Sequence, residues 1–314
     1  MRTPAKLPAQ LTGRSFTLAE AGAEGLAIGR LRAADLHTAS RGIRVPWGTG
    51  QAFTDVLRPL TELTDDGVIS HTTAARLHGI PLPPWARSEL TPHVSRPRGK
   101  VRPKRRGVKG HETTLAPHHV VVFEGLRVTS LARTWVDLAS VLPLEDLVVA
   151  ADFLINAHSD EFPVPREPLL SLEQLGAVVA ERKGNRGVAL AKRALDLARV
   201  GADSPPETLL RLRIVEAGLP EPDLNLVIRA RTGNAVVWPD LGYKKYRISI
   251  QYDGAHHLGD EQQTWDLGRH TSTDRAGWTQ VTVSDATIKR IGWDGVVREI
   301  RHRLVAKGWR PENP

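Results

Sequence analysis

The sequence predicts an α/β protein of the α+β kind, built from two domains. Its 314 residues exceed the length of one typical domain. Hydrophobic residues make up 40% of the chain and charged residues 25%, which is ordinary for a globular protein. In the second half, segments with helical spacing of apolar residues flank segments in which apolar and polar residues alternate, as in strands.

The first predicted element is a winged-helix unit over about residues 10–47. The segment FTLAEAGAEGLAIGRLRAADL can form two short helices joined near Gly25, and GIRVP is typical of a brief strand. Helix, turn, helix and strand in this order are the outline of a small winged helix. A helical hairpin that packs against the rest of the chain is the alternative interpretation.

The rest of the first predicted domain, residues 1–160, mixes both kinds of element. Ser70 or Thr72 can cap a helix that stops at Gly79. Strands are predicted in LTPHVS and HHVVVFEGLRVTS, and helices in SLARTWVDLASVL and LEDLVVAADFLI. The proline-rich stretch HSDEFPVPREP (158–168) is the predicted linker to a second domain over residues 169–314.

A focused basic segment lies within the first predicted domain. The chain has 43 Lys and Arg against 35 Asp and Glu, a net charge of +8. Residues 96–110 (RPRGKVRPKRRGVKG) contain no acid, so the excess is local, and we predict nucleic-acid contacts by their eight cations: Arg96, Arg98, Lys100, Arg102, Lys104, Arg105, Arg106 and Lys109. A flexible loop whose charges only keep it soluble is the alternative.

The second predicted domain has a clearer order of elements. SLEQLGAVVAERKG and GVALAKRALDLARV are predicted helices, and a third begins at Ser204 with Glu207 in its first turn. Three strands are then expected in DLNLVIRA, AVVWPDLGY and YRISIQYDG, followed by a helix in TWDLGRHTSTDRAGW, a strand in TQVTVS and a closing helix. This order predicts a core with one covered sheet.

Three acids have positions that suit a metal site. Glu207 lies early on a helix, Asp240 lies near the end of the second strand, and Asp253 ends the third. If these two strands pair, Asp240 comes close to Gln251 or Asp253. We therefore predict Mg²⁺, or Mn²⁺ in its place, on oxygens of Asp240, Gln251 and Asp253, where it would activate water against a phosphodiester. Solvent-exposed polar strand ends are the alternative.

The motifs SPPETLLRLRI, VVWPDLGY, ISIQYDGAHH and WDLGRHTSTDRAGWTQVTV together resemble the PD-(D/E)XK nuclease superfamily. The likeness covers about residues 203–285 and is nearest to an uncharacterised branch related to very-short-patch-repair endonucleases. It implies a restriction-endonuclease-like αβββαβ core. It also implies a catalytic set of Glu207, Asp240, Gln251, Asp253 and His257.

The same resemblance assigns a D-x-x-R pair, Asp266 and Arg269, to the helix after the third strand. His257 could act as a general acid or orient the phosphate, with the adjacent His256 less favoured, and either could be a loop histidine without a role. Asp266 and Arg269 are spaced as a helical ion pair. Arg269 is also a candidate phosphate contact.

One departure from the superfamily pattern separates two functions. Gln251 stands where relatives usually have glutamate, and the usual lysine is missing at Asp253. A glutamine offers a carbonyl oxygen to Mg²⁺ but brings no charge and cannot act as a base. The chain is therefore either a metal-dependent endodeoxyribonuclease or a non-catalytic DNA-binding protein, and the resemblance leaves enzyme activity open.

The first half is similar to winged-helix antitoxin-like proteins of the AbiEi type over about residues 10–155. The similarity rests on FTLAEAGAEG, GIRVP, ISHTTAARLHGIPLP and TSLARTWVDLA. It implies DNA binding, often with transcriptional autoregulation, and it names no catalytic residue. The non-catalytic alternative is therefore a regulator or a type IV antitoxin-like protein, with a toxin partner of unknown identity.

Composition indicates which nucleic acid the protein binds and in which compartment it works. Aromatic residues are sparse at 5%, without a stacking cluster, so duplex DNA is favoured over RNA. The chain has no cysteine, which excludes disulfides and thiolate catalysis and fits a reducing compartment. Without an apolar leader or a run of membrane-spanning length, we expect a cytoplasmic protein that does not enter a membrane.

Overall fold

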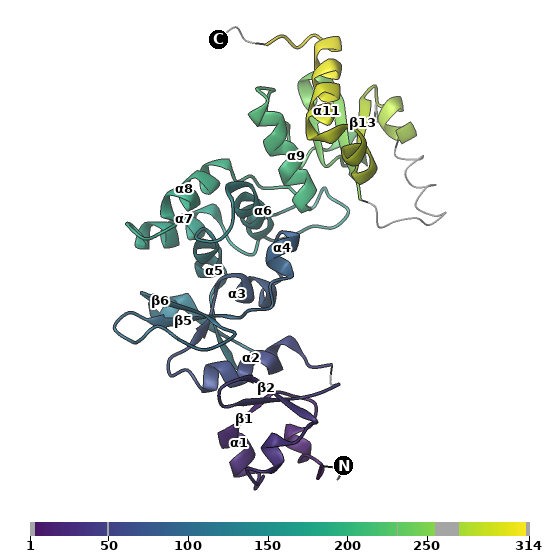
Figure 1. The fold of residues 1–314 in the computed structure, drawn as a ribbon. Coiled ribbons are helices and arrows are strands. Elements are labelled where there is room, and N and C mark those ends of the chain that lie inside the picture. The colour runs from purple at the N-terminus through teal and green to yellow at the C-terminus, as the bar shows by residue number, and fades with distance from the viewer. Residues whose placement is uncertain (1–3, 49, 231, 255–269, 312–314) are drawn as a thin grey trace. The chain divides into compact units, whose positions relative to one another are not determined.

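The computed structural model describes residues 4–48, 50–230, 232–254 and 270–311 and confirms a mixed α/β fold (Figure 1). The chain divides into two compact units. The N-terminal unit comprises residues 1–141 and 185–187, and the C-terminal unit comprises residues 142–184 and 188–314. The predicted linker 158–168 lies inside the C-terminal unit, where His158 and Arg166 form an antiparallel bridge.

The N-terminal unit begins with a small antiparallel sheet of order β1-β3-β2, joined by one α-helix. The helix α1 is capped by Thr17 and Glu20, each of which binds the other's backbone N–H. The second predicted helix is only a 3₁₀ turn, because Gly25 and Gly29 interrupt this short stretch. The elements are η1 (Ala9–Leu11), β1 (Phe16–Thr17), α1 (Leu18–Ala23), η2 (Arg30–Arg32), β2 (Leu36–Ser40) and β3 (Ile43–Pro46).

A five-stranded sheet of order β6-β5-β4-β8-β7 forms the larger part of this unit. Its apolar core includes Leu57, Ile69, Val94 and Val128. Strands β5 and β6 pair in parallel, so the chain between them, residues 98–108, crosses over and carries most of the basic segment. The strands are β4 (Val68–Ile69), β5 (His93–Pro97), β6 (Lys109–Thr113), β7 (Val120–Phe123) and β8 (Leu126–Thr129); the helices are α2 (Phe53–Glu62), α3 (His71–Leu77), α4 (Pro84–Arg87), η3 (Pro117–His119) and α5 (Leu131–Leu138).

The C-terminal unit places four helices before its sheets. Sheet β11-β12-β13 has an antiparallel pair and then a parallel pair, while β9 and β10 form a separate two-stranded sheet. Ile214, Ile250, Val283 and Leu304 pack in its core. The elements are α6 (Leu144–Ile155), α7 (Leu172–Glu181), α8 (Val188–Leu197), α9 (Pro205–Glu216), β9 (Ile228–Arg229), β10 (Ala235–Val237), β11 (Leu241–Tyr243), η4 (Lys244–Tyr246), β12 (Ile248–Asp253), β13 (Thr279–Ser284) and α11 (Asp285–Ala306), which is kinked at Gly292.

The predicted order of elements is present in this unit, with one correction. The predicted strand over AVVWPDLGY is broken at residues 238–240, so that β10 and β11 belong to different sheets. Pro239 explains the break, because proline has no N–H to donate to a ladder. Of the helix predicted over residues 264–278, the described part is helical at residues 270–275. Within the described ranges, no helix is both long enough and apolar enough to cross a membrane.

Candidate metal and nucleic-acid sites

The frame of the acidic site in the C-terminal unit is a buried ion pair between α6 and α9. Arg211 Nη2 lies 3.0 Å from Asp152 Oδ2, and both side chains are 1% exposed. Thr208 Oγ1 donates to the same oxygen, and the backbone N–H of Arg199 donates to Oδ1. Burial raises the pKa of Asp152, opposed mainly by the charge of Arg211. The pair fixes helix α9, which carries Glu207 in its first turn.

Glu207 is buried at the start of α9. Its oxygens accept hydrogen bonds from the Ser204 hydroxyl at 2.6 Å and from the Asp203 N–H at 2.8 Å. Burial, and next the negative charge of Asp240, raise the pKa of Glu207 to about 8. Two carboxyl groups therefore act on each other here, and Glu207 holds a proton at neutral pH.

Asp240 and Gln251 face each other across β11 and β12. Leu241 pairs with Ile250, so the next pair outward is Asp240 opposite Gln251. Gln251 Nε2 donates to Asp240 Oδ1 at 2.7 Å, and the Tyr252 N–H donates to Oδ2 at 2.6 Å. Gln251 Oε1 is buried and has no hydrogen-bond partner among the described residues. A buried acceptor without a hydrogen bond lowers the stability of the folded protein by about 1–3 kcal/mol, unless a ligand binds it.

The structure thus brings together Glu207, Asp240 and Gln251, which we call the acid cluster. Asp253 ends β12 two residues after Gln251, on the same face of the strand, and is exposed. Its place is the rim of the cluster. His256, His257, Asp266 and Arg269 lie outside the described residues.

The acid cluster fits a hard cation by its chemistry. Its donors are two carboxyl groups and one amide carbonyl, all of which are oxygen ligands of the kind Mg²⁺ prefers. A cation would supply Gln251 Oε1 with a partner and would offset the repulsion that raises the pKa of Glu207. Asp240 and Gln251 would hold it, with Glu207 behind them and Asp253 at the rim.

The basic segment is not a free ribbon, because most of its cations are engaged. Lys100 pairs with Asp66 at 3.1 Å, and Lys109 pairs with Glu89. Three guanidinium groups donate to backbone carbonyls of the N-terminal unit: Arg96 to Val101, Arg102 to Gly110 and Arg105 to Arg41. These five side chains hold the loop in place and are poorer candidates for phosphate contacts than the sequence suggests.

The remaining three cations, Arg98, Lys104 and Arg106, are exposed and make no ion pair with any described residue. The loop also lies against the turn between β2 and β3, where Ser40 Oγ donates to the Arg106 carbonyl at 3.0 Å. Arg41, on that turn, is exposed as well. The resulting basic surface therefore joins the crossover loop to the small sheet, a contact 66 residues apart in the chain that no local pattern indicates.

A group of buried histidines was missed by sequence reasoning. His71, His93 and His111 each offer one ring nitrogen, and these nitrogens lie within 4.8 Å of one another. We call this group the histidine cluster. The one available signal is that the strand segment at His93 and the segment at His111 flank the basic segment on either side.

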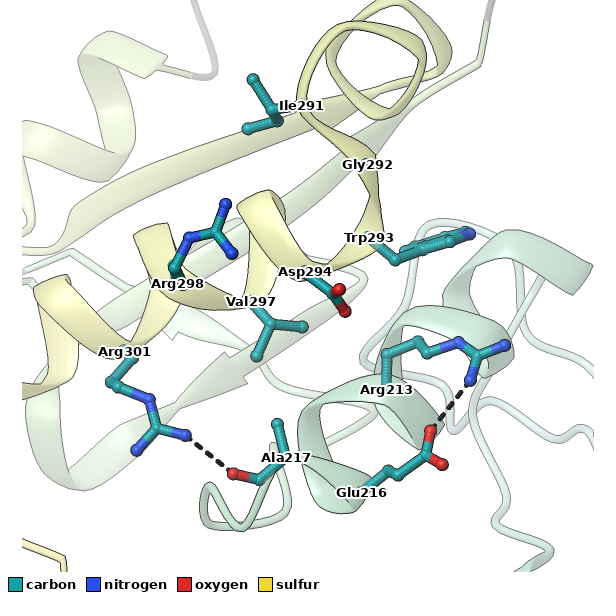
Figure 2. Close-up of a pocket in the computed structure, with 10 residues that line it drawn as sticks. All are labelled: Arg213, Glu216, Ala217, Ile291, Gly292, Trp293, Asp294, Val297, Arg298 and Arg301. Carbon is teal, nitrogen blue, oxygen red and sulfur yellow. Dashed lines mark hydrogen bonds and ion pairs between the residues drawn. The ribbon is translucent and has the colours of Figure 1, made fainter.

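The C-terminal unit also has a groove of about 820 Å³ at the kink of α11 (Figure 2). Its cations are largely occupied: Arg213 lies 2.8 Å from Glu216, and Arg301 donates to the Ala217 carbonyl at 2.8 Å. Its lining on α9 begins at Arg213, six residues from Glu207 and about 9 Å along the helix at a rise of about 1.5 Å per residue. The groove is therefore separate from the acid cluster.

Comparison with known proteins gives relatives without a described function. The chain is 30% identical over 129 residues to proteins of two strains of Mycobacterium tuberculosis, both described only as uncharacterized. The match covers 40% of this chain and 46% of each relative. No family model matches the chain. No solved structure matches it either.

Proposed function

We propose that the protein binds duplex DNA through its N-terminal unit and hydrolyses phosphodiester bonds in its C-terminal unit with Mg²⁺, or with Mn²⁺ in its place. The observation that carries the proposal is the acid cluster, in which a buried carboxyl, a strand carboxylate and a partnerless carbonyl oxygen converge. A DNA substrate places the protein in the cytoplasm, which suits a chain without cysteine.

Each residue of the acid cluster has a distinct task in this proposal. A bound divalent cation supplies Lewis-acid chemistry at the phosphate and an activated water. Asp240 and Gln251 Oε1 position it from two paired strands. Glu207 would lose its proton more readily once a cation offsets the negative charge of Asp240, and its carboxylate would then be available as a general base. Asp253 faces the incoming substrate from the rim.

The N-terminal unit supports the DNA-binding half of the proposal by charge. The three cations without ion pairs, Arg98, Lys104 and Arg106, lie on one loop whose backbone is pinned to the turn after β2. Guanidinium and ammonium groups held on a fixed loop bind phosphates with little loss of backbone entropy, and each contact releases condensed counterions. The loop therefore suits sequence-independent contact with the DNA backbone.

A second candidate function is a non-catalytic DNA-binding regulator or type IV antitoxin-like protein, with a toxin as its partner. The observation in its favour is that both Asp240 oxygens already accept hydrogen bonds, from the Gln251 amide and the Tyr252 N–H. Because residue 251 is a glutamine and not a glutamate, its amide can donate a hydrogen bond to Asp240, so that this carboxylate has a partner without a cation. In this function the C-terminal unit acts as a binding platform.

Cleavage of supercoiled plasmid by the full chain separates the two functions. We expect nicking or linearisation with Mg²⁺ or Mn²⁺, none with a chelator, and loss of at least about a hundredfold in Asp240→Ala, because removal of a stabilising group at a reacting centre costs about that much. Asp294→Asn, in the separate groove of Figure 2, is the matched control and should cleave normally. A wild-type protein that binds DNA and cleaves none with either metal would support the regulator.

A further inference from the structure

The histidine cluster has the spacing of a metal site. His111 Nε2 and His93 Nδ1 lie 3.1 Å apart, on strands β6 and β5. Two nitrogens bound to tetrahedral Zn²⁺ at 2.0–2.1 Å lie about 3.3 Å from each other. The His71 ring stacks on that of His111 with centroids 3.8 Å apart, and it comes from the start of α3. Three separate elements therefore bring imidazole nitrogens within 4.8 Å of one another, and a bound metal would turn the stacked His71 ring so that its nitrogen faces the other two.

A hydroxyl and a carboxylate lie behind two of the rings, on the side where supporting groups of metal ligands are usually found. Ser70 Oγ lies 2.9 Å from His71 Nδ1 and accepts a hydrogen bond from Ser95 Oγ at 2.7 Å. On the other side of the cluster, Glu89 Oε2 lies 3.8 Å from His93 Nε2. A hydroxyl or carboxylate behind a ligating imidazole fixes its tautomer and its direction.

His93 is buried, with its Nδ1 toward His111 and its Nε2 toward Glu89. Its side chain is 1% exposed, and its Nε2 has no hydrogen-bond partner within the described ranges. Burial, as the largest cause, lowers the pKa of His93 and of His111 to about 4.

The backbone at His71 has an uncommon conformation. This residue has φ +52°, in the left-handed region, although it is not glycine. Such a conformation costs about 1–3 kcal/mol and is found mainly at functional sites. The residue in this conformation is the one whose buried imidazole stacks on His111.

We propose that His71, His93 and His111 bind a divalent transition metal, with Zn²⁺ the expected ion. Imidazole nitrogens favour Zn²⁺ over the hard cations Mg²⁺ and Ca²⁺. Three histidines leave one tetrahedral position for water, reached past the half-buried His111. This site is separate from the acid cluster and does not depend on the proposed function.

The site would control the basic segment through its two ends. His93 precedes residues 96–110 by three positions, and His111 follows them directly. A metal bound to both strands would close the crossover loop at its base and restrict its motion, as a clip that closes a loop reduces its entropy. The loop itself carries Arg98, Lys104 and Arg106.

Titration of the metal-free full chain with Co²⁺, a spectroscopic substitute for Zn²⁺, tests the proposal. We expect one Co²⁺ per chain with the visible bands of a tetrahedral site, displaced by Zn²⁺. Affinity should fall about a hundredfold or more in His111→Gln and in His71→Asn, since loss of a ligand costs at least as much as loss of its supporting group. Asparagine tolerates the left-handed backbone at residue 71.

Two controls locate the binding. His302→Gln, at an exposed histidine of α11, and Asp240→Ala, in the acid cluster, should bind Co²⁺ as the wild type does. Zn²⁺ should also slow tryptic cleavage in the basic segment of the wild type but not of His111→Gln. A wild type without tetrahedral Co²⁺ bands, or folded His71→Asn and His111→Gln variants that bind like the wild type, would overturn the proposal.

Discussion

The histidine cluster of the N-terminal unit and the acid cluster of the C-terminal unit both bury ionisable groups, but they do so with opposite electrostatics. In the histidine cluster, burial keeps His93 and His111 neutral, and the two rings are hydrogen-bonded to each other. In the acid cluster, burial and next the negative charge of Asp240 raise the pKa of Glu207. The second cluster therefore contains a repulsion between like charges that a cation would relieve, whereas the first contains none while its rings are neutral.

This difference has a consequence for metal choice. Neutral nitrogens that converge at 3.1 Å favour a borderline-soft ion such as Zn²⁺, whereas oxygens around Asp240 favour a hard ion such as Mg²⁺. If both proposals hold, each cluster would prefer a different metal. Each of the following predictions changes one cluster, or its support, and leaves the other as the internal control.

The largest effect is expected for the support of the acid cluster. Asp152→Ala removes the buried carboxylate beside Arg211 and leaves the half-exposed Glu221 as the ion-pair partner of that guanidinium. It should lower the free energy of unfolding of the C-terminal unit by about 3 kcal/mol, the lower end of the cost of breaking a buried pair. Denaturant unfolding measures this loss, and Co²⁺ binding by the histidine cluster should persist under native conditions. Asp152→Leu combined with Arg211→Met should recover most of the stability. A single-variant loss below about 1 kcal/mol would mean that Arg211 has other sufficient partners.

In chelator-treated protein, the stability of the two units should also depend on pH in opposite directions. The folded pKa of Glu207, about 8, lies above the ordinary 4.5, so the stability of the C-terminal unit should fall as pH rises from about 4.5 to 8. The folded pKa of His93 and His111 lies below 6.5, so the stability of the N-terminal unit should fall as pH drops from about 6.5 to 4.

Hydrogen exchange followed by mass spectrometry resolves both units in the full chain. As pH rises, the free energy of unfolding of the C-terminal unit should fall by at most about 1.4 kcal/mol per pH unit. Glu207→Gln or saturating Mg²⁺ should remove this loss of stability. His111→Gln should leave this loss unchanged. A C-terminal unit whose free energy of opening, after correction for the intrinsic pH dependence of amide exchange, is constant between pH 5 and 8 would contradict the buried carboxyl at residue 207.

A smaller effect is expected when the acid cluster gains a charge. Gln251→Glu should tighten Mn²⁺ binding about tenfold and raise cleavage, because a third carboxylate would meet the ion in a partly buried site. Without a metal, the same variant should be less stable than the wild type, since Glu207 and Asp240 already repel. Loss of cleavage in Gln251→Glu would instead show that the amide donated to Asp240 is required.

The smallest effect is expected in the basic segment. Replacing Arg98, Lys104 and Arg106 with alanine should lower the slope of log affinity for duplex DNA against log salt by about 0.9 for each lost phosphate contact. Lys100→Ala combined with Lys109→Ala, at cations already paired with acids, should change the slope less. Equal slopes in the triple variant and the wild type would assign the loop to solubility.

Sequence patterns predicted what depends on local order. The alternation over residues 246–254 predicted strand β12, and the pairing expected between neighbouring strands does bring Asp240 to Gln251. The position of Ser204, Pro205 and Glu207 predicted the start of α9 within the precision of such patterns. The α/β class follows from these elements and is confirmed.

Sequence patterns did not predict what depends on distant contacts. The linker expected at 158–168 is part of the C-terminal unit, where His158 lies 2.8 Å from Asp203. Which cations of the basic segment are engaged is decided by Asp66, Glu89 and the turn after β2, all remote in the chain. The histidine cluster likewise joins residues 18 or more positions apart, whose rings meet only when β5 and β6 pair.

The most direct test of two chemically distinct sites is a paired titration of one preparation with Mn²⁺ and with Co²⁺. The signals are the electron paramagnetic resonance of bound Mn²⁺ and the visible bands of tetrahedral Co²⁺. We predict that Asp240→Ala loses the Mn²⁺ site and keeps the Co²⁺ site, and that His111→Gln does the reverse. A variant that loses both sites while still folded, or two variants that lose neither, would contradict the account.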